Sequence, residues 1–359
     1  MEPAETEVQQ LRSGYTQRTT APGLQNGTPS TLTAKVSGRP RRGRRRPQIT
    51  RLELNTKQRV GFYLMVGLLH LVSLMPDCLL YPLGICGGFI GYLVDRRHLK
   101  IGMCNLAIAF PERRLEERRR ILRASYINLG RSAAEYVRLG GFFYRRLIKR
   151  VTYQRFELWD QIRRLHPAKG ALVLGAHLGN FELMATAHAL HGHQISLVHH
   201  TQRFLAGDAL VSFVRERAGV TILRKHAAAR SVLTGLRQGQ LIGVPFDQNA
   251  KRSEAVFVPF FTEIAATASG LARVVALTGA PVIPAFIIRQ PNKRSHRIEI
   301  FEEIPIQRSA DSAADIEVNT RRFVKAVEDA VRRNPEQFLW THRRYRTRPV
   351  RGTPSFYQD

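Results

Sequence analysis

After Lys169 the chain alternates short apolar runs with longer stretches of helical spacing. The apolar runs are GALVLGAH, HQISLVHH, VTILRK, QLIGVPF and APVIPAFIIR. Stretches with helical spacing separate them, namely LMATAHALH, AARSVLTGLR and ATASGLARVVALT, and a final helix is expected at about 315–333. This alternation predicts an α/β fold with a mostly parallel central sheet flanked by helices.

We expect this domain to span residues 101–349. Before it we expect a disordered basic tail over 1–56 and a membrane-associated helical segment over 57–100, and after it a C-terminal tail over 350–359. The first 56 residues are rich in Thr, Gly, Pro, Ser and Gln, lack hydrophobic periodicity and end in an arginine-rich run, which is typical of disorder. No apolar stretch follows Met1, so this tail does not resemble a cleaved signal peptide.

The most apolar region is residues 60–94, which Pro76 and Asp77 divide into two pieces. Each piece is about 16–18 residues long, whereas a helix needs about 20 residues to cross hydrocarbon. We expect either one kinked membrane segment or a helical hairpin that dips into one leaflet, and a buried pair of core helices is the alternative. Basic residues on both sides predict that both ends face the cytoplasm. The basic helical stretch over 105–150 is expected to lie on a membrane surface or to present a solvated face.

The charge of the chain points to anionic partners, because 56 Lys and Arg against 28 Asp and Glu give a formal net charge of +28. Nucleic acid, an anionic membrane surface, an acidic carrier protein and a phosphorylated lipid all meet that condition. Three cysteines form neither a disulfide framework nor a metal spacing, and the histidines between 188 and 200 lack the accompanying ligands of a zinc site. We expect no metal and no cofactor.

The sharpest local motif is a strand that ends just before His177 and leads into a helix that contains Glu182. The carboxyl ends of strands in open α/β sheets are where sites form. A histidine there can remove the proton of a hydroxyl that attacks a thioester, and a carboxylate can orient its ring. Backbone N–H groups around Gly179 and Asn180 are candidate oxyanion donors. This prediction requires the His177 ring to face a cavity and Glu182 to point toward that ring.

Several blocks of the chain, over roughly residues 57–349, resemble the lipid A biosynthesis lauroyl/myristoyl acyltransferases and related bacterial glycolipid acyltransferases. In order they are RRHLKIGMCNLAIAFPE, Glu135 in the next helix, HLGNFE, FDQNAKRSEAVFVPFFTEIAATASGLARVVALTGAPVIPAF and NPEQFLWTHRRYRTRP. HLGNFE matches the family's His-x-x-x-x-Asp/Glu signature. The chain departs from the family pattern in having Glu at the acidic position, which many members share, and in its basic N-terminal tail.

The resemblance implies roles for five residues. His177 and Glu182 would be the catalytic pair, and Asp247 and Gln248 would form the family's Asp-Gln signature. Asp247 would hold an arginine or the sugar, with a turn-capping role as the alternative. Arg224 would contact acidic groups of the substrate.

The resemblance also implies an O-acyltransferase that moves a fatty acyl group from an acyl carrier protein thioester, or acyl-CoA, to a hydroxyl of a lipid A precursor or related glycolipid. We expect the enzyme at the cytoplasmic face of the cell inner membrane, with a phosphorylated glycolipid acceptor and an anionic membrane surface as partners. The run 257–261 is apolar enough to line an acyl channel, although core packing suits it equally well.

Two other functions remain open. The first is a nucleic-acid-binding protein that uses its basic segments, but no recognisable nucleic-acid-reading motif is present, so no specific nucleic acid is expected as a partner. The second is an inactive lipid-binding relative of the acyltransferases, against which the presence of both His177 and Glu182 argues.

Overall fold

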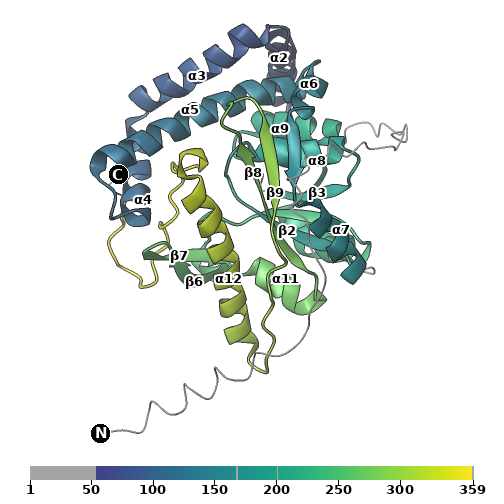
Figure 1. Ribbon diagram of the computed structural model, residues 1–359, viewed down its shortest axis with the longest axis vertical. Coiled ribbons are helices and arrows are strands. Elements are labelled where there is room, and N and C mark those ends of the chain that lie inside the picture. The colour runs from purple at the N-terminus through teal and green to yellow at the C-terminus, as the bar shows by residue number, and fades with distance from the viewer. Residues whose placement is uncertain (1–53, 167–168, 200, 358–359) are drawn as a thin grey trace, which may run out of the picture. The chain divides into compact units, whose positions relative to one another are not determined.

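A seven-stranded sheet lies at the centre of the structure, with helices on both of its faces (Figure 1). Its order is β1-β9-β8-β2-β5-β3-β4. The strands are β1 (Val151–Gln154), β2 (Ala171–Gly175), β3 (Ile195–His199), β4 (Thr221–Arg224), β5 (Leu241–Pro245), β8 (Val282–Arg289) and β9 (His296–Ile300). Strands β8, β2, β5, β3 and β4 are parallel, while β9 pairs antiparallel with β8 and parallel with β1. The predicted mostly parallel α/β fold is confirmed.

This computed structural model describes residues 54–166, 169–199 and 201–357, except for the side chains of 225–228. All of them belong to one compact unit. The predicted disordered tail over 1–56, including its arginine run, lies outside the described residues apart from its last three positions.

Two layers of helices cover the two faces of the sheet. On one face lie α7 (Phe156–Leu165), α8 (Phe181–Leu190) and α9 (Leu205–Ala218), and on the other lie α10 (Lys225–Arg237), α11 (Gly270–Thr278) and α12 (Ser312–Arg333). Successive side chains of a strand point to opposite faces, so Leu172 and Leu174 of β2 pack in one core and Ala171 and Val173 in the other. The inner strands β2, β5 and β8 are thus covered on both sides, as a parallel sheet requires, whereas the edge strand β4 is only half-buried.

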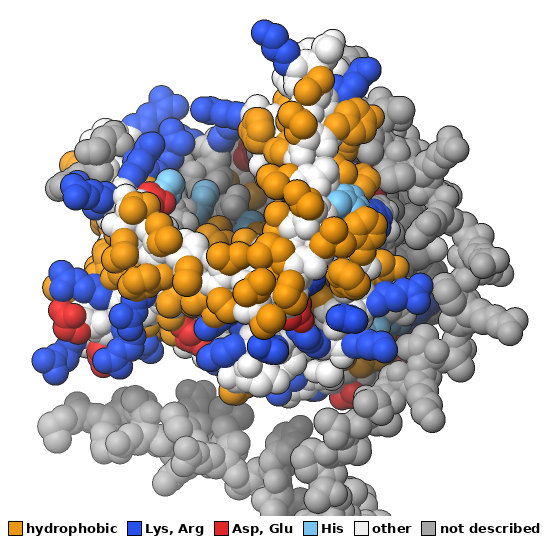
Figure 2. All heavy atoms as spheres, turned by 90° about the horizontal axis from the view of Figure 1, so that it is seen from above, with side chains coloured by type: hydrophobic (Ala, Val, Ile, Leu, Met, Phe, Trp, Pro, Cys, Tyr) orange, Lys and Arg blue, Asp and Glu red, His pale blue; other side chains and the backbone are white. Residues whose placement is uncertain are grey.

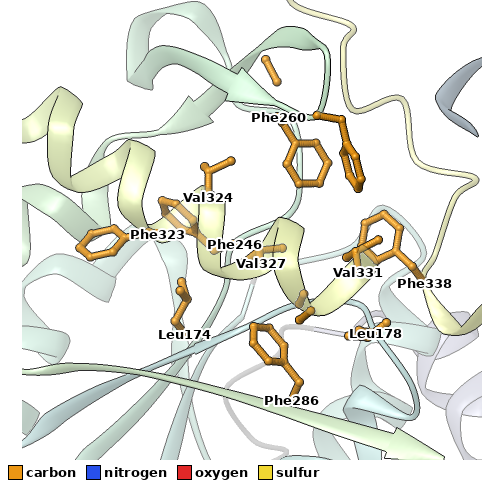
Figure 3. Close-up of a cluster of buried hydrophobic side chains, with 14 of the residues drawn as sticks. Leu174, Leu178, Phe246, Phe260, Phe286, Phe323, Val324, Val327, Val331 and Phe338 are labelled. Atoms are coloured by element: carbon orange, nitrogen blue, oxygen red, sulfur yellow. The ribbon is translucent and has the colours of Figure 1, made fainter. Parts of the chain in front are cut away.

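Helix α12 presents one continuous apolar face to the sheet. Figure 3 shows Phe323, Val324, Val327 and Val331 above Phe286 of β8, at the three- and four-residue spacing that keeps helical side chains on one face. All four α12 residues are almost completely buried. Each such side chain contributes about 1.5–3 kcal/mol on burial, so this helix fixes one side of the core.

A short antiparallel hairpin, β6 (Ala255–Phe260) and β7 (Glu263–Ala268), follows the 3-10 turn Arg252–Glu254. Val258, Phe260 and Phe261 are buried, and Phe261 packs against Phe110 and Trp340. The run 257–261 therefore contributes to core packing, which was the alternative to an acyl channel.

Between residue 54 and the sheet the structure describes five helices: α2 (Thr56–Ser73), α3 (Asp77–Val94), α4 (Arg96–Ala109), α5 (Leu115–Gly140) and α6 (Tyr144–Ile148). Pro76 caps α3 and so separates the apolar region into two helices that run in different directions (Figure 1). Of the described helices, α3 is long and apolar enough to cross a membrane, and 11% of it is buried. Because most of α3 is exposed, this helix is not one of a buried pair of core helices, which was the alternative for this region.

Helix α3 packs against α5 through glycines, which allow the two backbones to approach closely. A Cβ atom added at Gly88 would lie 2.4 Å from the carbonyl oxygen of Tyr126, whereas one added at neighbouring Gly87 would contact nothing within 4 Å. We expect Gly88→Ala to lower the free energy of unfolding by about 2 kcal/mol, and Gly87→Ala to raise it by about 0.5 kcal/mol because alanine favours the helix. Thermal unfolding of both variants in detergent measures this contrast. Equal stability of the two variants would contradict the close packing.

The segment that we set apart as a C-terminal tail packs against the domain. The hydroxyl of Tyr357 donates to Asn105 at 2.7 Å and accepts from the N–H of Tyr345, and the ring is buried. Aromatic residues at positions 356 and 357 supply the apolar surface that holds this segment to the domain.

Candidate active site

The register of two neighbouring strands brings His177 beside Asp247. Strand β2 pairs with β5 so that Gly175 lies opposite Pro245, and each polar residue follows its strand by two positions. The N–H of Phe246 donates to the carbonyl of Gly175, so the pairing continues beyond the strands. Both side chains thus emerge at the carboxyl edge of the sheet, where sites form in such folds.

Asp247 fixes the orientation of the imidazole. Its carboxylate oxygens lie 2.9 and 3.1 Å from Nδ1 of His177, and the backbone N–H of His177 also donates to it at 3.2 Å. An ionised carboxylate only accepts hydrogen bonds, so Nδ1 carries the hydrogen and Nε2 presents its lone pair. Nε2 lies 3.3 Å from the side-chain amide of Gln248. Asp247 is nearly inaccessible, whereas 16% of the His177 side chain is exposed.

The charged forms of His177 and Asp247 stabilise each other. Burial alone would lower the pKa of His177 and raise that of Asp247. The contact between them outweighs burial, so the pKa of His177 is raised and that of Asp247 is lowered. Asp247 therefore stays ionised near neutral pH. His342, which accepts the backbone N–H of Asn249 at 3.0 Å, has its pKa lowered to about 4 by burial and remains neutral.

Glu182 does not occupy the position that we predicted for it. Its carboxylate makes a bidentate ion pair with Arg215 of α9 at 2.6 and 2.9 Å, and the carboxylate at Nδ1 of His177 belongs to Asp247 instead. The predicted direct contact between His177 and Glu182 is wrong, because a guanidinium matches a carboxylate in two parallel hydrogen bonds and holds it. The charge of Glu182 still acts on His177, whose pKa it helps to raise.

Arg215 is held in turn by His199, a residue for which the sequence predicted no role. Nη1 of Arg215 lies 2.9 Å from Nδ1 of His199, and because a guanidinium only donates, Nδ1 accepts. Nε2 of His199 then donates to the buried Asp208 at 2.7 Å. Burial first, and the neighbouring arginines, lower the pKa of His199 despite the Asp208 contact, in keeping with a neutral ring.

Arg224, at the end of β4, lies at the same edge of the sheet. Its guanidinium contacts Asp208 at 3.2 Å and the hydroxyl of Thr201 at 3.3 Å. Its predicted contact with acidic groups of a substrate stays a prediction.

The turn between His177 and α8 is strapped down by the segment around the 3-10 helix η3 (Pro335–Gln337). The carbonyl of His177 accepts the N–H of Leu339, and the N–H of Gly179 donates to the carbonyl of Gln337, both at 3.0 Å. Gly179 has a φ of 64°, and a Cβ atom there would lie 1.9 Å from the carbonyl oxygen of Ile287. Glycine is therefore required, but its N–H is already bonded, which corrects the prediction that it serves an oxyanion.

Asn180 joins this turn to a buried charged cluster. Its side chain caps α8 by accepting the N–H of Leu183 and donates to Glu135 of α5 at 2.8 Å. Glu135 also pairs with Arg289 at the end of β8 and with His296. Burial would raise the pKa of Glu135, but these two partners lower it to about 2. Asn180 thus fixes the helix start, rather than offering a substrate contact through its side chain.

An apolar cavity of about 500 Å³ lies beside the pair, between α2, α5, α8 and α9. Leu68 and Val72 line it from α2, Ala133 from α5, and Phe181 and Glu182 form its wall on α8. The ring of Phe181 also packs edge-on against His177, with centroids 4.6 Å apart. The His177 ring thus lies next to the cavity wall. Pockets of this size and apolarity suit hydrophobic ligands.

His188 in the last turn of α8 and His193 just after the helix pack together. Across the described part of the chain, no group of three or more His, Cys, Asp or Glu residues is arranged to hold an ion. His188 stacks on His193, and its Nδ1 lies 3.1 Å from the hydroxyl of Tyr153.

Comparison with known proteins identifies related chains. A family model described as bacterial lipid A biosynthesis acyltransferase matches residues 49–347. The lipid A biosynthesis lauroyltransferase of Escherichia coli K12 is 28% identical over 297 residues, which cover 82% of this chain and 94% of that protein. The lipid A biosynthesis myristoyltransferase of the same organism is 26% identical over 292 residues, or 80% of this chain and 87% of that protein.

Proposed function

The chain belongs to the bacterial lipid A biosynthesis acyltransferase family and is an O-acyltransferase, and from this premise we propose that His177, oriented by Asp247, is its general base. The observation that carries the proposal is the contact between Asp247 and Nδ1 of His177, which leaves Nε2 as the proton acceptor. The proposed acceptor is a hydroxyl of a phosphorylated, lipid A-type glycolipid. The donor is a fatty acyl thioester of acyl carrier protein or of coenzyme A.

In the proposed reaction, the acceptor hydroxyl replaces the amide of Gln248 at Nε2 of His177. The imidazole takes the hydroxyl proton while the oxygen attacks the thioester carbonyl, and Asp247 stabilises the imidazolium. The tetrahedral intermediate then expels the thiolate, which recovers the proton from His177. The products are an ester and a free thiol, and the base returns to its starting state.

In this proposal Glu182 positions Arg215, whereas its spacing from His177 suggested that it orients the His177 ring. Glu182 lines the cavity and holds the guanidinium of Arg215, and both charges act on the His177 ring. Since the N–H of Gly179 is engaged, we infer that Arg215 supplies the positive charge near the developing oxyanion. A guanidinium fixed on two sides, by Glu182 and His199, needs little reorganisation to do so.

We further propose that the cavity between α2 and α5 receives the fatty acyl chain. Ala133 lies in its α5 wall, and a phenylalanine there would fill part of the space. Ala133→Phe is expected to lower kcat/KM for a long-chain donor by about tenfold or more relative to a short-chain donor. Ala133→Ser, which barely changes the volume, is the matched control. Equal losses for long and short donors would contradict this use of the cavity.

The basic charge of the chain suits an enzyme whose acidic donor and phosphorylated acceptor meet at an anionic membrane surface. We propose that it works at the cytoplasmic face of the inner membrane, where acyl thioesters are available.

The experiment that tests this function uses the purified full-length protein in mixed micelles, with an acyl carrier protein thioester and a phosphorylated lipid A precursor. Mass spectrometry of the lipid should show an increase by one acyl group, and free thiol should appear in equal amount. A precursor of unchanged mass, with acyl-CoA also tried as donor, would refute the proposal and favour the inactive lipid-binding relative.

A further inference from the structure

Helices α2 and α3 each present a continuous apolar face to the outside of the protein. The exposed large hydrophobic residues recur at three- and four-residue intervals, which keeps them on one side of each helix. They are Val60, Tyr63, Leu64, Leu68 and Leu71 on α2, and Leu79, Leu83, Phe89, Ile90, Leu93 and Val94 on α3. Figure 2 shows them as two bands of hydrophobic side chains that meet, with lysine and arginine side chains along their borders.

The opposite face of α3 is fixed lengthwise on α5. Leu80 and Tyr81 are buried, and further along the helix Gly84 and Gly88 meet the α5 backbone. A Cβ atom at Gly84 would lie 2.6 Å from the carbonyl oxygen of Gly130. Small residues at such a seam let two helices pack closely. At its start α3 is held by Asp77, which pairs with Arg138 of α5 at 2.7 Å.

Helix α5 is in turn tied to the sheet, so α3 cannot turn independently of the domain. The hydroxyl of Ser125 donates to the carbonyl of Phe338 at 2.6 Å, and Glu135 pairs with Arg289 of β8. Both contacts are buried. The direction of α3 relative to the catalytic edge of the sheet is therefore set by the fold.

Charges along α5 oppose a perpendicular insertion of α3. Arg123, which is exposed, and Arg131, which is half-buried, lie on the stretch of α5 that runs beside α3. If α3 crossed a bilayer, α5 would accompany it, and each arginine near the centre of the hydrocarbon would cost about 2.5–3.5 kcal/mol or more. With α3 lying flat, these side chains stay at or outside the interface.

Exposed basic residues lie at the ends of the helices that carry or border the apolar bands. The exposed ones at the helix ends are Lys57 and Arg59 in the first turn of α2, Arg96, Arg97 and Lys100 in α4, and Arg145, Arg146 and Lys149 around α6. Each such residue near an anionic surface contributes about 1 kcal/mol of attraction. An apolar face rimmed by basic side chains is typical of a helix that lies in the membrane interface.

We propose that α2 and α3 both lie flat in one leaflet of a bilayer that contains anionic lipids, and that neither helix crosses it. Leu68 belongs to the exposed face of α2, where it is 59% exposed, and also lines the apolar cavity. The cavity therefore opens onto the acyl-chain region of that leaflet. This inference rests on the proposed function. The opening of the cavity at Leu68 gives the fatty chains of donor and acceptor a route from the leaflet to His177 without exposure to water.

The test is the depth of three positions on the outward face of α3, at residues 79, 86 and 93. They lie two helical turns apart, and Cys86 is a native exposed cysteine. Single-cysteine full-length proteins, Leu79→Cys, native Cys86 and Leu93→Cys with the other cysteines changed to serine, carry an environment-sensitive fluorophore. They are reconstituted with phosphatidylglycerol-containing vesicles, and lipids brominated at known depths quench the label. Lys325→Cys on α12, an exposed position, is the control outside the bilayer.

A flat helix predicts equal depths for the three labels, within one leaflet, and no quenching at residue 325. A crossing helix predicts depths that differ by about 21 Å between residues 79 and 93, at 1.5 Å per residue. That gradient, or the absence of quenching at all three positions, would overturn the proposal. The readout does not use acyl transfer, so a protein that lies flat but transfers nothing refutes the proposed function and leaves the docking intact.

Discussion

Replacing His177 with alanine is expected to lower kcat/KM by about a thousandfold or more, because the variant has no group that can take the acceptor proton. The measurement is the initial rate of acyl transfer from a thioester to the lipid acceptor. The backbone of this residue is held by Leu339 and by Asp247 independently of the ring, so the turn should keep its shape. Residual activity should no longer depend on a group that titrates near neutral pH.

His166→Ala is the matched control, since His166 pairs with Glu303 and precedes β2, at the opposite edge of the sheet. It should leave turnover close to that of the wild type. The thermal midpoint of each variant in detergent separates loss of chemistry from loss of fold. A folded His177→Ala protein with wild-type turnover would remove His177 from the mechanism.

Asp247→Asn is expected to lower kcat by about a hundredfold to ten-thousandfold while preserving the fold. The amide keeps the size of the side chain but can donate to Nδ1, which favours the imidazole tautomer whose proton sits on Nε2. That tautomer cannot accept the hydroxyl proton. Initial rates at saturating donor and acceptor measure the effect, and Asp329→Asn, at an exposed carboxylate on α12, is the control.

The pH dependence of the acyl-transfer rate is expected to differ between the wild type and Asp247→Asn. Burial would lower the pKa of His177, but the charge of Asp247 raises it overall, so in the wild type the active, neutral ring forms only above this raised pKa. The rate should therefore climb with pH through a value above the ordinary 6.5 of histidine. Without the carboxylate the pKa falls, and the acid limb of the profile should move to lower pH while its plateau drops. An unshifted limb would contradict the contact.

The adjacency of His177 and Asp247 was within reach of the sequence. Both residues come two positions after a short apolar strand, and the strands were recognised. What the sequence did not provide was the strand order, in which β5 lies next to β2 although two strands intervene along the chain. The sequence favoured Glu182 as the partner of the His177 ring because Glu182 follows His177 by only five residues. Asp247 follows it by 70 residues, and a motif search along the chain does not connect residues so far apart.

Other parts of the site depended on contacts that no local pattern encodes. Arg215 lies in α9, and its partner His199 ends β3, 16 residues earlier along the chain. The segment from Gln337 to Leu339, which holds the His177 turn, belongs to the block NPEQFLWTHRRYRTRP, for which the sequence predicted no role. Apolar composition located α2 and α3 correctly, but only the glycine seam with α5 fixed the direction of α3.

The most direct test of the account is an NMR titration of the His177 ring in protein labelled with ¹⁵N-histidine, assigned with the His177→Ala variant. We predict a pKa above 6.5, a neutral form protonated at Nδ1, and a larger fall of the pKa in Asp247→Asn than in Glu182→Gln. A ring whose pKa responds to Glu182→Gln and not to Asp247→Asn would show that Asp247 does not orient the catalytic base.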